Sequence, residues 1–229
     1  MPTPPRYRPE EFTAAGEPRP DRPARPQDAA SLLLWRPTRR GAEVLMGVRS
    51  AKHRFMPSVL VFPGGGVDPA DRSAPAARPL PEATRAALEH RASPRLAHGL
   101  AMAALRELKE ETGLHLSAET PSGPLPDPGH LSYLCRALTP ALSPVRFNAR
   151  FLVAPGEEAA GTLGGSGELE HLGWYRLDGP LPHAPALITA RVLEEFRAWL
   201  AMSEEQRRSR PLVWFQGRDN RRLERPRRR

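Results

Sequence analysis

The stretch 106–114 constrains the fold most, because its sequence, Arg-Glu-Leu-Lys-Glu-Glu-Thr-Gly-Leu, is typical of the end of a packed helix. The five residues before it, Ala-Met-Ala-Ala-Leu, are all tolerated or favoured in helices. Leu105, Leu108 and Thr112 recur at helical spacing and are expected to face a core. Gly113 then provides the left-handed residue at which many helices end. The sequence therefore predicts a helix that packs on a core and ends at Gly113.

Three carboxylates lie on one side of this predicted helix. Glu107, Glu110 and Glu111 are spaced i, i+3 and i+4, so their side chains neighbour one another. Their charges repel, and the C-terminal end of the helix adds a partial negative charge of its own. A hard cation such as Mg²⁺ or Mn²⁺ between the carboxylates would relieve this repulsion. A solvated acidic helix face has the same spacing, so the spacing alone leaves both interpretations open.

The stretch 106–114 also matches half of a known signature. Its form, Arg-Glu-Leu-x-Glu-Glu-x-Gly-Leu, resembles the second half of the signature of Nudix hydrolases, which act on nucleoside diphosphates linked to another group. The first half of that signature is a Gly, five residues, a Glu and seven residues before the Arg. Here Asp71 stands at the Glu position counted from Gly65, and a long segment, 72–105, replaces the seven residues.

This departure resembles a subgroup of the family whose signature is interrupted by an insertion. Phe-Met-Pro at 55–57 and Val-Phe-Pro-Gly-Gly-Gly-Val-Asp-Pro-Ala-Asp at 61–71 are similar to this subgroup, which includes peroxisomal coenzyme A diphosphatase-like proteins and many bacterial relatives. The resemblance covers roughly residues 28–200. It makes coenzyme A, acyl-CoA, ADP-ribose and NADH the candidate substrates.

The resemblance implies a hydrolase that depends on Mg²⁺ or Mn²⁺ and cleaves the diphosphate by attack of water at phosphorus. In such a site the glutamates hold the cation, a carbonyl from Gly65 joins them, and Arg106 orients the carboxylates by bridging to Glu110. An arginine keeps its proton and is therefore not expected to act as the base. The candidate catalytic residues are Arg106, Glu107, Glu110 and Glu111, and the candidate metal ligands are Glu107, Glu110, Glu111 and Gly65.

Candidate substrate-binding residues precede the motif. Arg49 and Arg54 belong to a basic loop just before the Gly-rich segment, and arginines bind diphosphate oxygens well. An ordinary solvated loop has the same composition, so this interpretation stays open. Gly64 and Gly65 let the backbone approach a ligand closely. We therefore take these two arginines and two glycines as the candidate substrate-binding residues.

Acidic residues outside the motif have two interpretations each. Asp68 and Asp71 either lend charge near the site or cap a turn or a short helix. Glu168 and Glu170 precede a Trp, as in the last strand of the family, where a glutamate serves as base or extra metal ligand. Both glutamates also suit a solvated strand end. The candidates for the catalytic base are Glu110, Glu111, Glu168 and Glu170.

The order of strands and helices predicts an α/β fold, a sandwich of the Nudix type with helices on both sides of a mixed sheet. We expect a disordered Pro/Arg-rich segment at 1–27, one hydrolase domain at 28–202 and a basic tail at 203–229. The insertion, at about 72–97, emerges beside the motif, where it forms either a lid or a passive excursion. The expected strands are 29–35, 43–48, 59–62, 131–138, 145–153 and 168–177, and the expected helices besides the motif helix are 82–90 and 185–200.

Composition and charge indicate where the protein is located and which partners it has. The 229 residues carry a formal net charge of +8, with the basic residues concentrated at the ends. Cys135 is the single cysteine, so no disulfide within the chain is expected, and a cytoplasmic location follows. The chain contains no apolar run that approaches the length of a membrane span. A nucleotide is the expected partner and a homodimer is a further prediction, since Nudix relatives are often dimers.

Two alternatives come from other functional classes. The first is a catalytically silent domain of this fold that binds a nucleotide or a protein partner. The second is nucleic-acid processing, such as hydrolysis at an RNA 5′ end, which the basic ends suggest. Nucleic acid is not expected as a partner, because the sequence contains no recognition motif and no evident aromatic platform for stacking bases.

Overall fold

The computed structural model describes residues 24–50, 58–141, 143, 145–216 and 220–225. Nine strands of the described part form one mixed sheet. They are β1 (Gln27–Thr38), β2 (Gly41–Arg49), β3 (Leu60–Val61), β4 (Gly64–Gly66), β8 (Ser132–Leu138), β9 (Phe147–Pro155), β11 (Leu169–Arg176), β12 (Leu212–Gln216) and β13 (Asn220–Glu224).

The strand order is β11-β2-β1-β9-β8-β12-β13, with β3 paired to β2 and β4 paired to β1. β1 lies parallel to β9, and β12 lies parallel to β8. The other pairs are antiparallel. Two small hairpin-like sheets complete the strands: β5 (Leu114–His115) with β10 (Ala160–Gly161), and β6 (Ser117–Ala118) with β7 (Leu125–Pro126).

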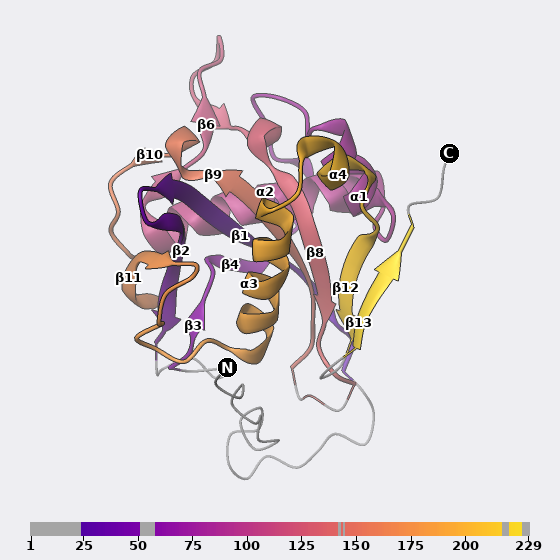
Figure 1. The fold of residues 1–229 in the computed structure, drawn as a ribbon. Helices are drawn as coiled ribbons and strands as arrows, with labels where there is room; N and C mark the ends of the chain where they lie inside the picture. The colour runs from indigo at the N-terminus through magenta and orange to yellow at the C-terminus, as the bar shows by residue number, and fades with distance from the viewer. Residues whose placement is uncertain (1–23, 51–57, 142, 144, 217–219, 226–229) are drawn as a thin grey trace.

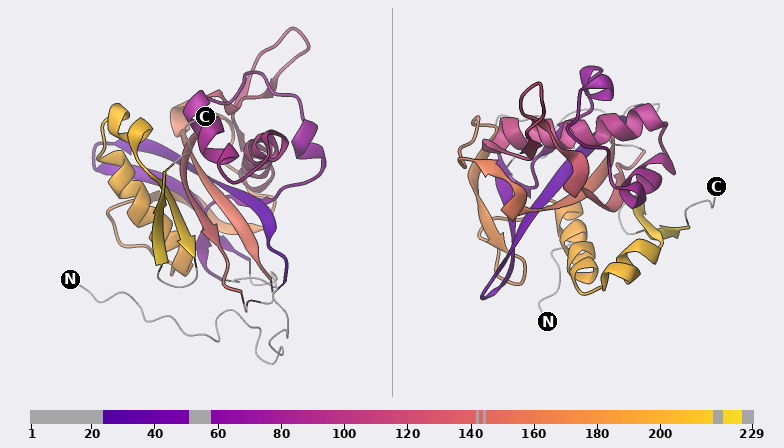
Figure 2. Two further views of the ribbon diagram at one scale, coloured as in Figure 1. Left: turned by 90° about the vertical axis from the view of Figure 1, so that its right-hand side faces the viewer. Right: turned by 90° about the horizontal axis from the view of Figure 1, so that it is seen from above.

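Helices cover both faces of the main sheet. Helices α1 (Glu82–Glu89) and α2 (Pro94–Thr112) lie behind the sheet in Figure 1, and α3 (Leu187–Leu200) and α4 (Glu204–Ser209) lie in front of it. Short 3₁₀ turns of the described residues are η2 (Ala70–Ser73), η3 (Pro128–His130) and η4 (Gly156–Glu158). The view from above shows the same three layers (Figure 2). The structure thus confirms the predicted α/β sandwich with a mixed sheet.

The alternation of side chains along β1 explains the two cores. Leu32 and Leu34 point to one face and are buried with Leu105 and Leu108 of α2. Leu33 points to the other face and is buried among residues of α3 such as Phe196. Successive residues of a strand face opposite sides, so a strand that is buried on both sides reads as a continuous apolar run. The run Leu-Leu-Leu of β1 is such a case.

Helix α2 begins and ends as its capping residues dictate. The Ser93 side chain accepts a hydrogen bond from the Leu96 amide at the N-terminus. Gly113 adopts φ 73°, and its amide bonds to the Lys109 carbonyl, as the sequence predicts for the C-terminus. Leu108 and Thr112 are fully buried, which confirms their predicted packing.

The insertion is docked on the sheet away from the motif. Thr84 of α1 donates a hydrogen bond of 2.7 Å to the Leu131 carbonyl, just before β8. Arg78 forms an ion pair with the buried carboxylate of Asp127. His90, at the end of α1, contacts Glu224 of β13. Helix α1 therefore lies over β8 and the β13 edge, whereas the Gly-rich strand β4 pairs with β1, so α1 does not form a lid over β4.

The C-terminal segment differs from the prediction of a basic tail that starts at residue 203. Ser203 begins α4 with a capping box, in which its side chain and that of Gln206 bond to each other's backbone. Strand β12 then pairs in parallel with β8 and buries Val213 and Phe215 on the α3 side. The apolar run Leu-Val-Trp-Phe at 212–215 already suggests docking on the domain, but the charged residues around it hide that it is a strand. The folded domain therefore extends beyond residue 202.

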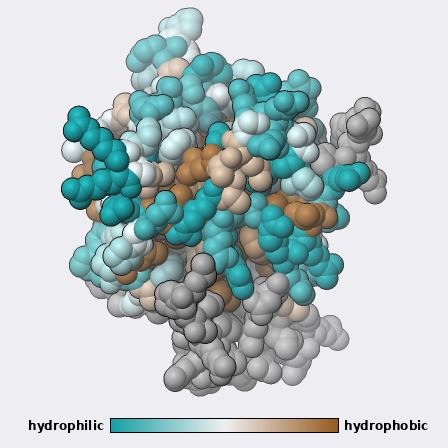
Figure 3. All heavy atoms as spheres, viewed as in Figure 1, coloured by the Kyte–Doolittle hydropathy of each residue, from teal (hydrophilic) through white to brown (hydrophobic). Residues whose placement is uncertain are grey.

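Other expectations concern the termini and the surface. Residues 1–23 of the predicted disordered segment lie outside the described residues, and Gln27 already belongs to β1. Cys135 is free and fully buried in β8. The face in Figure 3 is mostly hydrophilic with small hydrophobic patches. None of the described helices combines the length and the apolar character that crossing a membrane requires.

Candidate functional site

Arg106 joins the two halves of the motif. Its Nε and Nη2 atoms each donate a hydrogen bond of 3.1 Å to the carboxylate of Asp71. Nη2 also donates to the Gly66 carbonyl at 3.0 Å. Nη1 donates to Glu107 at 2.8 Å and to Glu110 at 2.9 Å. These bonds to carboxylates raise the pKa of Arg106, with the Asp71 hydrogen bond as the largest cause. The guanidinium thus holds α2, β4 and η2 in one arrangement.

Asp71 fulfils both roles that the sequence leaves as alternatives: it caps a turn, and it places a negative charge near the site. Its side chain is 4% exposed. One carboxylate oxygen accepts a hydrogen bond of 2.8 Å from the Asp68 amide, which closes the turn at η2. Both oxygens also bond to Arg106. The sequence signal for the second role is the spacing of Asp71 from Gly65, which equals that of the glutamate in the uninterrupted signature.

Glu111 is the most buried of the three motif glutamates. It is 4% exposed, and its Oε2 accepts a hydrogen bond of 2.8 Å from the Gly64 amide. Burial raises the pKa of Glu111 to about 8, and the neighbouring charge of Glu107 adds to the rise, while the Gly64 amide opposes it. A positive charge beside this carboxylate would favour its ionised form.

The glycines of β4 lie directly against the acidic side chains. A Cβ atom on Gly65 would lie 2.2 Å from Oε1 of Glu107, so the absence of a side chain there makes room for the carboxylate. Gly64 has φ 156°, and a Cβ atom there would lie 2.4 Å from the Ala30 carbonyl oxygen of β1. Burial raises the pKa of Glu107, while the contact with Arg106 opposes the rise. The close approach of the β1 backbone thus requires glycine at position 64, whereas glycine at position 65 leaves the room that the Glu107 carboxylate occupies.

The three motif glutamates are held by two partners in this arrangement. Arg106 bonds to Glu107 and Glu110, and the Gly64 amide bonds to Glu111. Within the described ranges, no group of three or more His, Cys, Asp or Glu side chains is placed so that it could hold a metal ion. The predicted convergence of the carboxylates on one cation is therefore absent from the arrangement described. The donor set itself, buried and half-buried carboxylates beside backbone carbonyls, fits a hard divalent cation by its chemistry.

The structure brings some of the remaining predicted residues to the cluster. The positive charge of Arg49 lowers the pKa of Glu111, and the negative charge of Glu168 raises it, so both lie nearby. Arg49 pairs with the residue after Glu168 between β2 and β11. Glu170 is exposed on β11 opposite Val48. Arg54 lies outside the described residues.

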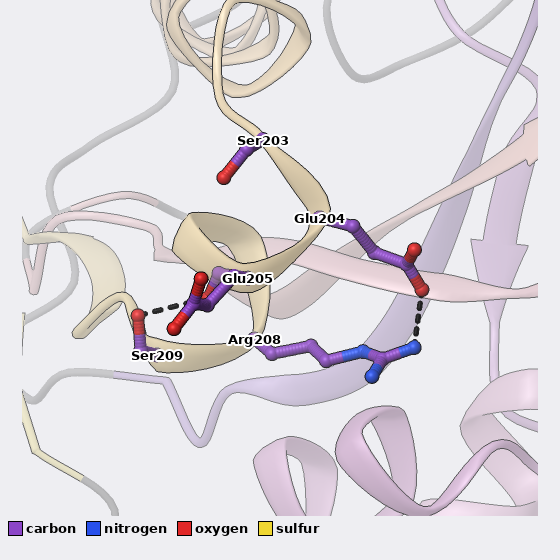
Figure 4. Close-up of a pocket in the computed structure, with 5 residues that line it drawn as sticks. All are labelled: Ser203, Glu204, Glu205, Arg208 and Ser209. Carbon is purple, nitrogen blue, oxygen red and sulfur yellow. Dashed lines mark hydrogen bonds and ion pairs between the residues drawn. The ribbon is translucent and has the colours of Figure 1, made fainter.

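A hollow of about 580 Å³ lies elsewhere, at α4. Figure 4 shows its five lining residues: Ser203, Glu204, Glu205, Arg208 and Ser209. Glu204 pairs with Arg208, and the Ser209 hydroxyl bonds to the Glu205 carbonyl. All five residues belong to one short helix and its cap, and their polar groups bond to one another, so the hollow does not compete with the motif as a candidate site.

Comparison with known proteins identifies the fold through solved structures. No protein-family model matches the sequence, and no curated protein matches it. Among solved structures, a Nudix hydrolase from Alicyclobacillus acidocaldarius aligns with a TM-score of 0.56 and 24% identity over 74% of this chain and 90% of that one. The Nudix domain of NrtR from Shewanella oneidensis, in complex with ADP ribose, aligns with a TM-score of 0.50 and 15% identity over 85% of this chain and 94% of that one. The chain therefore has the α/β fold of the Nudix hydrolases.

Proposed function

We propose that the protein is a metal-dependent hydrolase of a nucleoside diphosphate linked to another moiety. The observation that carries the proposal is the Arg106 network, which ties the carboxylates of Asp71, Glu107 and Glu110 to the backbone of β4. A solvated acidic helix face has no need of a half-buried arginine bridge or of a glycine strand packed against it. The fold shared with a solved Nudix hydrolase supports the same conclusion.

The residues of the site have different proposed roles in the reaction. Glu107, Glu110, Glu111 and the carbonyl of Gly65 would hold Mg²⁺ or Mn²⁺. That cation, when bound, neutralises diphosphate charge and lowers the pKa of a water molecule. Arg106 orients Glu107 and Glu110 and cannot act as the base, because it keeps its proton.

Two further residues act from the β2–β11 side of the site. Arg49 lies near Glu111 and supplies positive charge for diphosphate oxygens. Glu168 lies near both Glu107 and Glu111, so we prefer it to Glu170 as the base outside the motif. A base must lie within hydrogen-bonding reach of the water it activates, and the neighbourhood of Glu168 to the carboxylate cluster supports that role.

The substrate is proposed at the level of its class. The interrupted signature supports coenzyme A or acyl-CoA, and the solved NrtR domain, which was crystallised with ADP ribose, adds that nucleotide as a comparison. NADH and a dinucleoside polyphosphate complete the set. We further propose a cytoplasmic location for the enzyme, in which the buried thiol of Cys135 stays reduced. The homodimer stays a prediction, which analytical ultracentrifugation tests.

Hydrolysis of these compounds at about 5 mM Mg²⁺ or Mn²⁺ tests the proposal. We expect turnover that requires the metal and is lost in the double variant Glu110→Gln, Glu111→Gln. The matched control is Glu204→Gln, Glu205→Gln, which removes two carboxylates from the exposed face of α4. The proposal fails if folded wild-type protein turns over none of the compounds. Calorimetry that then detects nucleotide binding would establish the silent binding domain instead.

A further inference from the structure

A row of basic and aromatic residues crosses four strands at the C-terminal side of the sheet. Arg150 of β9 lies opposite Arg136 of β8, Arg136 lies opposite Trp214 of β12, and Trp214 lies opposite Arg222 of β13. Residues directly opposite each other on neighbouring strands point to the same face of a sheet. The four side chains therefore form one row, which we call the Arg–Trp row.

The Arg–Trp row lies on the face that carries α1. Arg150 donates to the carbonyl of Arg91, which follows α1, and Arg91 pairs with Glu224 two residues along β13 from Arg222. Leu88 of α1 lines the same narrow space as Arg136 and Trp214, so α1 covers the inner part of the row. Trp214 and Arg136 are half-buried, and Arg222 is exposed. The outer part of the row is thus accessible from solvent.

Trp214 stands between two guanidinium groups. The Cζ atom of Arg136 lies 5.1 Å from the centroid of its ring, and that of Arg222 lies 5.6 Å away on the neighbouring strand. Both distances are within the range of a cation–π contact. Each neighbouring strand therefore places a cation over the ring, and of the two arginines only Arg222 is exposed.

The positive charge in the row is only partly neutralised. Arg150 is buried and pairs with Asp28 at 2.6 Å, and Arg91 pairs with Glu224 at 2.6 Å. Arg136 donates to the neutral side chain of Asn148 at 2.7 Å. Across the described residues, neither Arg136 nor Arg222 has a carboxylate within ion-pair distance. Burial, together with the charges of Arg150 and Arg91, lowers the pKa of Arg136, which an adjacent anion would reverse.

The surface at the Arg–Trp row has almost no cavity, so it suits an extended ligand. A pocket beside Arg136 and Trp214 has a volume of only about 10 Å³, roughly the room for one water molecule. A free nucleotide therefore finds no cavity to enclose it there. A chain that lies along the surface can draw the exposed Arg222 to a phosphate and place a base on the face of the Trp214 ring that Arg222 leaves.

We propose that the Arg–Trp row binds single-stranded nucleic acid. Arginines that bind phosphates beside an aromatic ring that stacks a base are the combination by which many proteins hold single strands. The net charge of +8 attracts a polyanion from a distance. The site is separate from the carboxylates of α2, which would repel phosphates. The sequence hides the row, because its members meet only when β12 pairs with β8.

Binding of a fluorescein-labelled oligouridine of about 12 nucleotides, followed by fluorescence anisotropy at low salt, tests the proposal. We expect wild-type protein to bind, and the double variant Arg136→Gln, Arg222→Gln to bind at least about tenfold more weakly. The slope of log K against log salt should shrink by about 1.4, because each lost phosphate contact on a single strand contributes about 0.7. The single variant Arg222→Gln, at an exposed position, gives the same direction of change without risk to the fold.

The matched control is Arg36→Gln, Arg85→Gln, which removes two other arginine charges. Arg36 lies 4.3 Å from the ring centroid of Trp174 near the opposite edge of the sheet, but it is neutralised by Glu43 at 2.8 Å. Arg85 is similarly paired with Glu89. The control should bind almost as the wild type does. Equal weakening in both double variants, or no binding by the wild type at low salt, would overturn the proposal. Equal affinity for a duplex of the same length would overturn the preference for single strands.

Discussion

The guanidinium of Arg106 bonds through two hydrogen bonds of 3.1 Å to the carboxylate of Asp71, which lies 35 positions earlier in the chain. The contact brings together two pieces of a motif that the sequence separates by a long insertion. The intervening residues are accommodated as α1, which docks beside β8, and as the first turns of α2. The motif is therefore continuous in space although it is interrupted in sequence.

Replacing Asp71 by Asn should lower both stability and turnover. The change keeps the size of the side chain but leaves the half-buried Arg106 without its strongest partner, which costs about 2–4 kcal/mol of unfolding free energy. Urea denaturation and hydrolysis assays measure the two effects. Asp71→Glu, which keeps the charge, should recover part of the activity. Asp178→Asn, at an exposed ion pair with Arg197, should change stability by less than about 0.5 kcal/mol.

Replacing Gly65 by Ala should abolish most of the activity. The new Cβ atom would lie 2.2 Å from Oε1 of Glu107, so the carboxylate has to move. A displacement of about 1 Å at a catalytic group costs on the order of 10²-fold in rate. Gly66→Ala is the matched control, because a Cβ atom there meets nothing within 4 Å. Similar rates for the two variants would show that the position of Glu107 does not matter to the reaction.

Replacing Glu111 by Gln should preserve the stability of the metal-free protein but remove its stabilisation by Mg²⁺. In a chelator, the variant should be as stable as the wild type or more stable by up to about 1 kcal/mol, because it removes a carboxyl that is costly to ionise when buried. Added Mg²⁺ should raise the melting temperature of the wild type by mass action but not that of the variant. Thermal unfolding with and without Mg²⁺ measures both effects. A variant that responds to Mg²⁺ as the wild type does would remove Glu111 from the metal ligands.

The contact of the insertion with Asp127 should make stability depend on acid pH. Burial by itself raises the pKa of Asp127, but Arg78 and the Gly129 amide lower it below its ordinary value of 3.8. Because the folded pKa is the lower one, the contribution is fully present above about pH 4 and is lost as the pH falls through the folded pKa. Solvent screening at the exposed Arg78 guanidinium keeps this contribution small.

Urea denaturation at pH 7 and at about pH 3 checks this prediction. Asp127→Asn should be less stable than the wild type at pH 7, and the difference should narrow towards pH 3, because the carboxylate of the unfolded wild-type chain is protonated first and the ion pair loses its advantage. Glu82→Gln, at a highly exposed position of α1, serves as the control for charge removal in the insertion. A difference between Asp127→Asn and wild type that stays constant with pH would contradict a role for the ion pair.

Local patterns predicted the elements that depend on neighbours in sequence. The end of α2 followed from Leu108 and Gly113, and the strand character of β1 followed from its apolar run. The partner of Asp71 was not predictable, because hydrogen bonds between distant residues leave no periodic pattern. Strand β12 was assigned to a tail, since its pairing with β8 depends on the path of the chain through α3. The division of the motif glutamates between Arg106 and the Gly64 amide likewise depends on where β4 lies.

The parallel pairing of β12 with β8 has a consequence for how the protein can be shortened. With β12 and β13 in place, the backbone amides and carbonyls on that side of β8 are paired within the molecule. Cutting the chain at residue 202 would leave them as an open strand edge, which invites pairing between molecules and aggregation. A shortened version of this protein should therefore retain the chain at least through Glu224, and an affinity tag belongs beyond that point.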